Sequence, residues 1–123
     1  MKITTFNPQI VTKNAEGLIK LFEELGFERR HRQEGIGDLD VTGIRMKDSD
    51  GHYVDISEVD IGLKEDKVAI RMNVDDFDEA FEKLVALGFK NVYGHHKVDT
   101  KTSKSAMMIS ESGFAINLVQ HIK

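Results

Sequence analysis

The chain has 123 residues, with 21 acidic and 17 basic side chains, and its formal net charge is −4. Because phosphate backbones are bound by clustered Lys and Arg, this balance argues against nucleic acid as the main partner. The sequence contains no cysteine, which excludes disulfides, thiolate metal sites and a cysteine nucleophile. It also shows no apolar stretch of the kind found in leaders or membrane spans, so we expect no membrane partner and a cytoplasmic location.

The first half of the chain predicts one strand, one helix and three further strands. Apolar residues recur at helical spacing between Ala15 and Leu25, with Asn14 before them as an N-cap and Gly26 after them as a stop signal. The Asp50-Gly51 pair is typical of a two-residue hairpin turn. We therefore expect a helix over residues 14–26, strands over residues 3–11, 28–33, 41–47 and 52–59, and a polar, mobile stretch at residues 33–40.

The second half repeats this pattern at a constant offset. Leu25-Gly26-Phe27 recurs as Leu87-Gly88-Phe89, a shift of 87 − 25 = 62 residues. Asp76 and Glu79 form a capping box where the second helix begins. We expect a helix over residues 76–88, strands over residues 67–74, 91–98, 105–110 and 114–121, and a polar, mobile stretch at residues 99–104. The chain is thus predicted to be a single domain of two βαβββ repeats, residues 1–60 and 66–123.

Alternation along the strands separates an apolar face from a polar one, because adjacent side chains of a strand point to opposite faces. The apolar parity should lie beneath the helices and comprises Phe6, Ile10, Val54, Ile56, Ile70, Met72, Ile116 and Leu118. The other parity gathers amides, charges and a tyrosine on a concave surface that suits a small polar or partly aromatic ligand. The candidate ligand-binding residues on it are Asn7, Gln9, Tyr53, Asp55, Arg71, Asn73 and Asn117.

Four segments carry a resemblance to a known superfamily: Asn14–Phe27, Asp50–Ile56, Asp75–Phe89 and Gly113–Leu118. Together with the duplicated βαβββ order, they resemble the vicinal oxygen chelate superfamily of glyoxalases, extradiol dioxygenases, epimerases and bleomycin- and fosfomycin-resistance proteins. The resemblance implies an α+β fold in which two tandem βαβββ units form an eight-stranded, incompletely closed barrel around a cleft. It also leads us to expect a homodimer.

In metal-using members of that superfamily, four cleft-facing side chains bind one divalent ion. The resemblance places these positions here at Asn7, Asp55, Ala69 and Asn117, while a slip in the first strand would nominate Gln9 with Arg71. The four positions supply one carboxylate, two amides and a methyl group, which is too little charge to hold a divalent cation. We therefore expect no bound metal and no cofactor.

Three of the candidate residues each admit two roles. Arg71 is either an anchor for a ligand carboxylate or phosphate, or the ion-pair partner of Asp55. Asp55 is correspondingly a general base or an anchor for a cationic group, or the other half of that pair. Tyr53 either stacks on a ring of the ligand or packs at the edge of the sheet.

The low count of metal ligands and the net acidic charge favour a binding function. We expect a small-molecule-binding protein of the glyoxalase/bleomycin-resistance type without a catalytic metal. One alternative is a lyase, isomerase or dioxygenase with a degenerate or shifted metal site. Another is a regulatory or structural module whose cleft is vestigial.

Overall fold

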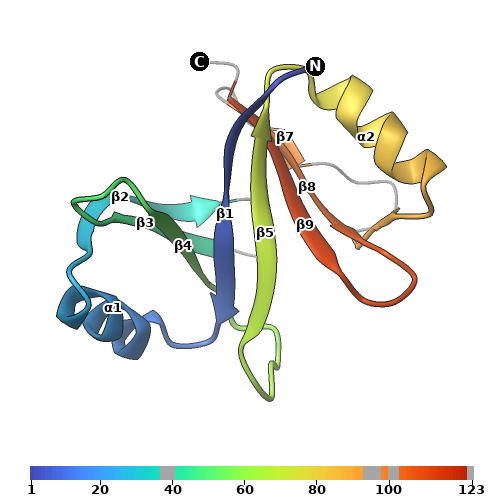
Figure 1. Cartoon of the computed structure of the whole chain (residues 1–123). Helices are drawn as coiled ribbons and strands as arrows, with labels where there is room; N and C mark the ends of the chain where they lie inside the picture. Colours follow the sequence, from blue (N-terminus) through green and yellow to red (C-terminus); the bar gives the residue numbers. More distant parts are fainter. Residues whose placement is uncertain (37–40, 93–97, 100–102, 122–123) are drawn as a thin grey trace. The chain divides into compact units, whose positions relative to one another are not determined.

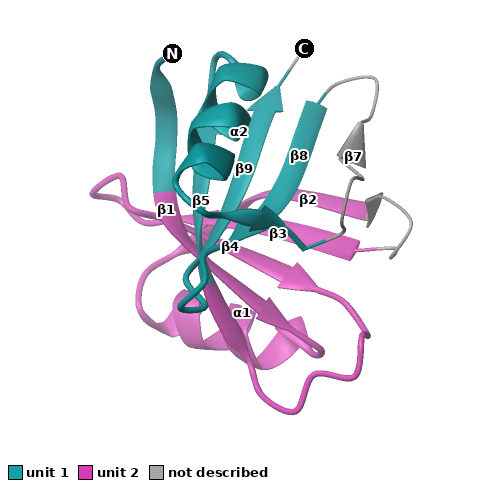
Figure 2. Ribbon diagram, turned by 90° about the vertical axis from the view of Figure 1, so that its right-hand side faces the viewer, with its two compact units in different colours: residues 1–6, 69–123 teal, residues 7–68 magenta. Residues whose placement is uncertain are grey.

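The computed structural model describes residues 1–36, 41–92, 98–99 and 103–121 (Figure 1). It divides into two compact units (Figure 2): unit 1 comprises residues 1–6 and 69–123, and unit 2 comprises residues 7–68. The elements in chain order are β1 (Ile3–Thr12), α1 (Ala15–Glu24), β2 (Glu28–Ile36), β3 (Val41–Lys47), β4 (Tyr53–Glu58), β5 (Lys67–Val74), α2 (Phe77–Ala86), β6 (Lys90–Asn91), β7 (Val98–Asp99), β8 (Ser103–Ile109) and β9 (Ala115–His121).

Unit 2 is a sheet of order β2-β3-β4-β1 with α1 packed on one face (Figure 2). The β2–β3 and β3–β4 pairs are antiparallel, whereas β4 and β1 run parallel. The core between α1 and the sheet consists of apolar side chains from one parity of each strand. Its buried members are Ala15, Ile19, Ile44, Met46, Val54 and Ile56. The polar side chains at the alternating positions therefore lie on the opposite face of these strands.

Unit 1 repeats this architecture with a sheet of order β5-β9-β8-β6, in which β7 also pairs with β8. Strands β5 and β9 run parallel, and β8 pairs antiparallel with β9. The buried core under α2 comprises Met72, Val74, Phe77, Ala80, Ala106, Met108, Ile116 and Leu118.

The strand registers of the two units agree with the sequence repeat. Gln9 lies opposite Asp55 in the β1–β4 pair, and Arg71 lies opposite Asn117 in the β5–β9 pair. The second pair of residues follows the first at the offset of the sequence repeat, since 71 − 9 = 62 and 117 − 55 = 62. The predicted α+β fold of two tandem βαβββ units is confirmed.

Both helices begin and end close to the predicted residues. The side chain of Asn14 accepts a hydrogen bond from the Glu16 amide at 3.2 Å, and that of Asp76 accepts one from the Glu79 amide at 3.1 Å. Gly26 and Gly88 follow the helices with φ angles of 100° and 99°, a left-handed conformation that favours glycine. Among the described helices, none is long and apolar enough to cross a membrane.

The strand predicted over 28–33 is present but longer than expected. Strand β2 continues to Ile36, because Gln33 and Ile36 pair with β3, so residues 33–36 are not the mobile stretch that was expected there. Residues 37–40 lie outside the described part of the chain. The side chains of residues 28–34 are exposed, so this strand carries no apolar signal. Of the strand expected over 91–98, Asn91 belongs to β6, Val92 lies in a turn and Val98 belongs to β7, while residues 93–97 lie outside the described part of the chain.

The apolar parity was predicted correctly except near the start of β1 and in the middle of β5. Ile10, Val54, Ile56, Met72, Ile116 and Leu118 pack in the two cores. Phe6, however, is 63% exposed, and Ile70 is only half-buried. The parallel pairing of β1 with β4 covers Gln9–Thr12, so Phe6 precedes the paired segment and belongs to unit 1, not to the unit of α1.

Each helix is also capped from the last strand of its own unit. The Glu58 carboxylate at the end of β4 accepts a hydrogen bond from the Ala15 amide at 2.8 Å. Gln120 near the end of β9 accepts one from the Phe77 amide, also at 2.8 Å. These bonds satisfy amide groups that a helix start otherwise leaves without acceptors.

Loss of either cap should destabilise the chain. We expect Glu58→Ala and Gln120→Ala each to lower the free energy of unfolding by about 1 kcal/mol, the usual cost of a lost N-terminal cap. Glu58→Gln should cost less, because an amide oxygen performs this role in unit 1. Urea unfolding followed by circular dichroism measures the difference, and equal losses in Glu58→Ala and Glu58→Gln would contradict it.

Candidate functional site

The centre of the polar face in unit 2 is a buried contact between Asn7 and Asp55. Asn7 comes from β1 and Asp55 from β4, and their side chains are 6% and 4% exposed. Asn7 Nδ2 donates a hydrogen bond to Asp55 Oδ2 at 2.7 Å. Two of the predicted ligand-binding residues therefore meet on one face of the sheet. A buried carboxylate is costly unless it is hydrogen-bonded, which this contact provides.

Strand β3 adds a cation that the sequence analysis did not include. Arg45 Nη2 donates a hydrogen bond to Asn7 Oδ1 at 3.1 Å, and its guanidinium lies 4.2 Å from the centre of the Tyr53 ring. Lys47 Nζ lies 5.1 Å from the same centre. Alternation with the buried Ile44 and Met46 is a signal that could have placed Arg45 and Lys47 on the polar face.

A second polar contact lies further along the same two strands. The side chain of Gln9 is buried, and its Nε2 donates a hydrogen bond to Ser57 Oγ at 2.6 Å. The polar face of unit 2 thus brings together four predicted residues, Asn7, Gln9, Tyr53 and Asp55, with Arg45 beside them.

The remaining predicted residues lie in unit 1. Arg71 Nε donates a hydrogen bond to Asn73 Oδ1 at 3.0 Å, and Arg71 Nη2 lies 3.5 Å from His121 Nε2. Asn117 lies opposite Arg71 in the parallel β5–β9 pair. The structure therefore places Arg71, Asn73 and Asn117 together on neighbouring strands of unit 1.

The side chains at the positions of the superfamily's metal ligands do not fit a metal in either unit. In unit 2, Asn7 Oδ1 accepts a hydrogen bond from a guanidinium and Asp55 Oδ2 accepts one from an amide, so both oxygens face N–H donors. A positive charge so close to the amide oxygen repels a cation. In unit 1, Ala69 has no ligating atom. Within the described ranges, no group of three His, Asp or Glu side chains could hold an ion.

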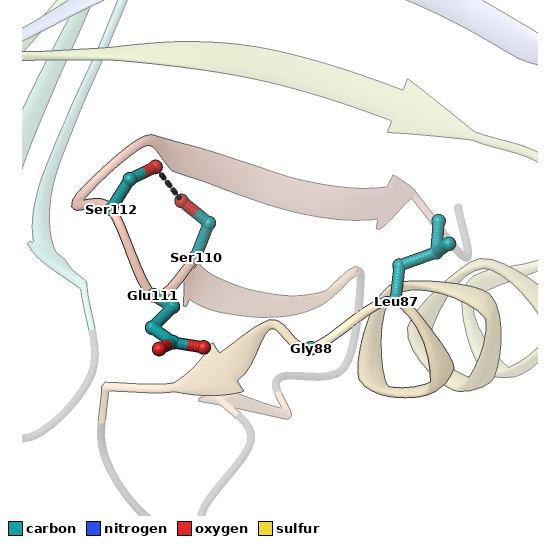
Figure 3. Close-up of a pocket in the computed structure, with 5 residues that line it drawn as sticks. All are labelled: Leu87, Gly88, Ser110, Glu111 and Ser112. Carbon is teal, nitrogen blue, oxygen red and sulfur yellow. Dashed lines mark hydrogen bonds between the residues drawn. The ribbon is translucent and has the colours of Figure 1, made fainter.

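A surface depression of about 470 Å³ lies elsewhere in unit 1 (Figure 3). It is lined by Leu87 and Gly88 after α2 and by Ser110, Glu111 and Ser112 in the turn between β8 and β9. None of the predicted site residues belongs to it. Its polar side chains include the Ser110–Ser112 pair, whose hydroxyl oxygens lie 3.1 Å apart. The buried polar cluster of unit 2 is the better candidate for chemistry.

An ion pair of Asp48 and His52 closes the turn before β4. Asp48 Oδ2 lies 2.8 Å from His52 Nδ1, and Asp48 Oδ1 accepts hydrogen bonds from the backbone amides of Asp50 and His52. The hydrogen bond to Asp48 raises the pKa of His52 above 6.5, and the same bond lowers the pKa of Asp48 below 3.8. The bond therefore favours the charged form of both groups.

The shifts define the pH range in which this turn is most stable. The contribution of His52 is complete below pH 6.5 and is lost as pH rises through its raised pKa. The contribution of Asp48 is complete above pH 3.8 and is lost as pH falls through its lowered pKa. We expect Asp48→Asn to move the His52 pKa back toward 6.5 in an NMR titration. An unchanged His52 titration in this variant would contradict the assignment.

Comparisons with known proteins show the fold. No protein-family model matches the chain, and no curated protein matches it. Among solved structures, a complex of Streptomyces coelicolor methylmalonyl-CoA epimerase with 2-nitronate-propionyl-CoA is similar, with a TM-score of 0.73 and 16% sequence identity over 99% of this chain and 100% of that one. The Mycobacterium tuberculosis methylmalonyl-CoA epimerase has a TM-score of 0.72 and 14% identity over 96% and 88% of the two chains.

A third similar structure comes from Vibrio splendidus 12B01 and is described as a glyoxalase/bleomycin resistance protein/dioxygenase superfamily member. Its TM-score is 0.63, with 16% identity over 98% of this chain and 100% of that one. The chain therefore shares its fold with these structures, and this is the α+β fold of two βαβββ units that the sequence resemblance implied.

Proposed function

We propose that the chain binds a small molecule without a metal ion, as a protein of the glyoxalase/bleomycin-resistance type. The observation that carries this proposal is the buried polar cluster of Asn7, Asp55 and Arg45 in unit 2. The apolar core of the unit lies on the other face of the sheet, so these groups are not needed to fill it. Convergent amides and charges held in fixed positions are typical of ligand sites.

Further support comes from the other predicted residues. Gln9 and Tyr53 share the polar face with the cluster, and each offers a group that can hydrogen-bond or stack on a ligand. In unit 1, we propose Arg71, Asn73 and Asn117 as further ligand-binding residues, with Arg71 oriented by its bond to Asn73. Variants in each unit test the two groups of residues separately.

A screen of small molecules by thermal shift, run with and without EDTA, tests this proposal. Compounds that stabilise the protein should do so equally in both conditions. Asn7→Ala should weaken their binding by about tenfold, the effect of losing a buried hydrogen bond near the ligand. Gln33→Ala, which removes an exposed amide on β2, is the matched control and should bind normally. Binding that disappears with EDTA, or a screen without any ligand, would contradict the proposal.

A second candidate is an isomerase, which the structural likeness to methylmalonyl-CoA epimerases favours. An epimerase of that kind removes and returns a proton next to a carbonyl group, and this step needs a base. Asp55 is the carboxylate of the unit 2 cluster and would take this role. Incubation with methylmalonyl-CoA in D₂O tests this candidate, and the expected result is deuterium incorporation that Asp55→Asn abolishes.

We also propose that the protein is a cytoplasmic homodimer, which rests on the sequence composition and on the superfamily resemblance. Size-exclusion chromatography with light scattering measures the oligomeric state, and a monomer at micromolar concentration would contradict the dimer. Cell fractionation tests the location, and recovery outside the cytoplasmic fraction would contradict that part.

A further inference from the structure

Arg45 and Lys47 place two positive charges against one aromatic ring in unit 2. Their distances from the centre of the Tyr53 ring are 4.2 Å and 5.1 Å. In the part of the chain that the structure describes, neither side chain belongs to an ion pair. Glu28 is the register partner of Lys47, but its carboxylate lies 3.5 Å from Arg30 instead. Asp55 is the register partner of Arg45, and the two are linked through Asn7. Among the described residues, no carboxylate forms an ion pair with either cation.

The guanidinium of Arg45 is held in place by its neighbours, but not all of its N–H groups have hydrogen-bond acceptors among the described residues. Its Nη2 is fixed by Asn7 and its plane lies near the Tyr53 ring. Its Nε is buried and has no hydrogen-bond acceptor among the described residues. A buried donor without an acceptor costs roughly 1–3 kcal/mol, so an oxygen brought to this guanidinium by a ligand would be bound favourably.

The other repeat shows that the fold does not need these cations. At the offset of 62 residues, Arg45 corresponds to Met107 and Lys47 to Ile109. Both units form the same antiparallel pair at these positions, β3 with β4 and β8 with β9. The register partner differs, since Met107 lies opposite Asn117 and Arg45 lies opposite the carboxylate of Asp55. The strand itself therefore forms without a cation at this position, and the charge in unit 2 belongs to the polar cluster of Asn7 and Asp55.

We infer that Arg45 and Lys47 form an oxyanion-binding site that takes a carboxylate or phosphate group of the small ligand. This inference rests on the proposed function and names the chemical class of its ligand. The planar fork of Arg45 matches the oxygens of either group, and Lys47 adds a point charge. The guanidinium is also hydrogen-bonded to Asn7, so an anion held by it would lie beside the polar cluster of unit 2.

NMR titration of the ¹⁵N-labelled full chain tests the site, with malonate, inorganic phosphate and the neutral malonamide as probes. We expect malonate, phosphate or both to shift the side-chain Nε–H signal of Arg45, and malonamide to leave it in place. Binding by malonate alone assigns a carboxylate, and binding by phosphate alone assigns a phosphate. Either result supports the inference.

Arg45→Met introduces the residue that unit 1 has at this position, and Lys47→Met provides a second variant. Each should weaken binding of the anion by about tenfold or more, because a hydrogen bond or contact to a charged group is lost. Arg32→Met is the matched control, since Arg32 lies on β2 and is 3.7 Å from Glu34. It should bind the anion normally.

Two results would overturn the inference. They are equal binding of malonate and malonamide, and anion binding that both variants retain. If anions fail to bind but a neutral or cationic compound from the thermal-shift screen shifts the Asn7 amide signals, the inference fails while the proposed binding function stands. If no compound binds at all, both fail.

Discussion

Phe77→Ala should lower the free energy of unfolding by about 3–5 kcal/mol, the usual cost of truncating a buried aromatic side chain. Phe77 begins α2, is fully buried and stacks on Phe81 with ring centres 5.8 Å apart. Its counterpart in unit 2 is Ala15, so the variant gives unit 1 the residue that unit 2 already has. The strands under α2 are packed around the phenyl ring, however, and a cavity would remain.

Urea unfolding monitored by circular dichroism measures this effect. Leu87→Ala is a suitable control, because Leu87 follows the same helix and is 76% exposed. Its free energy of unfolding should stay within about 0.5 kcal/mol of the parent value. If Phe77→Ala lowered the free energy of unfolding by less than about 1 kcal/mol, the core of unit 1 would not be organised around this ring.

Asp55→Ala should both destabilise the protein and remove ligand binding. The substitution leaves the buried Nδ2 of Asn7 without its carboxylate acceptor, at a cost of roughly 1–3 kcal/mol. Asn7 then no longer holds Arg45 in a fixed position, so the polar cluster loses its geometry. Asp55→Asn keeps an acceptor oxygen and should retain more stability.

Unfolding in urea and titration with a ligand from the screen separate the two effects. Asp60→Ala removes an exposed carboxylate just beyond β4 and should leave both stability and binding unchanged. Binding that survives in Asp55→Ala would remove this cluster from the ligand site. A large loss of stability in Asp60→Ala would show that net charge, rather than the Asn7 contact, explains the result.

The fold could be predicted because its signals are local and occur twice. Asn14 and Asp76 start the helices by bonding amides two or three residues away, and Gly26 and Gly88 end them through backbone conformation alone. Because the pattern repeats at an offset of 62 residues, the order of strands and helix along one half could be checked against the other half. The last three residues of β2 were not predicted, because the exposed side chains of this strand carry no apolar alternation and its end depends on the pairing with β3.

The candidate site was predicted only in part, for a different reason. Strand parity predicted that Asn7 and Asp55 lie on the polar face, but it did not predict their hydrogen bond. That bond depends on the parallel pairing of β1 with β4, which places Asp55 opposite Gln9, two residues from Asn7. The bond of Arg45 to Asn7 depends on how a long, flexible side chain crosses from β3 over the neighbouring strand β4 to β1. Strand parity is compatible with that contact, but it does not determine which of the many arginine rotamers Arg45 adopts.

The position of Tyr53 gives the protein an optical reporter of its own. The sequence has no tryptophan and two tyrosines, so its ultraviolet emission comes from Tyr53 and Tyr93. Because two cations lie within about 5 Å of the Tyr53 ring centre, any anion that draws them away changes the electric field at that chromophore. In a Tyr93→Phe background, occupancy of the cationic face could then be followed by tyrosine emission without an added label.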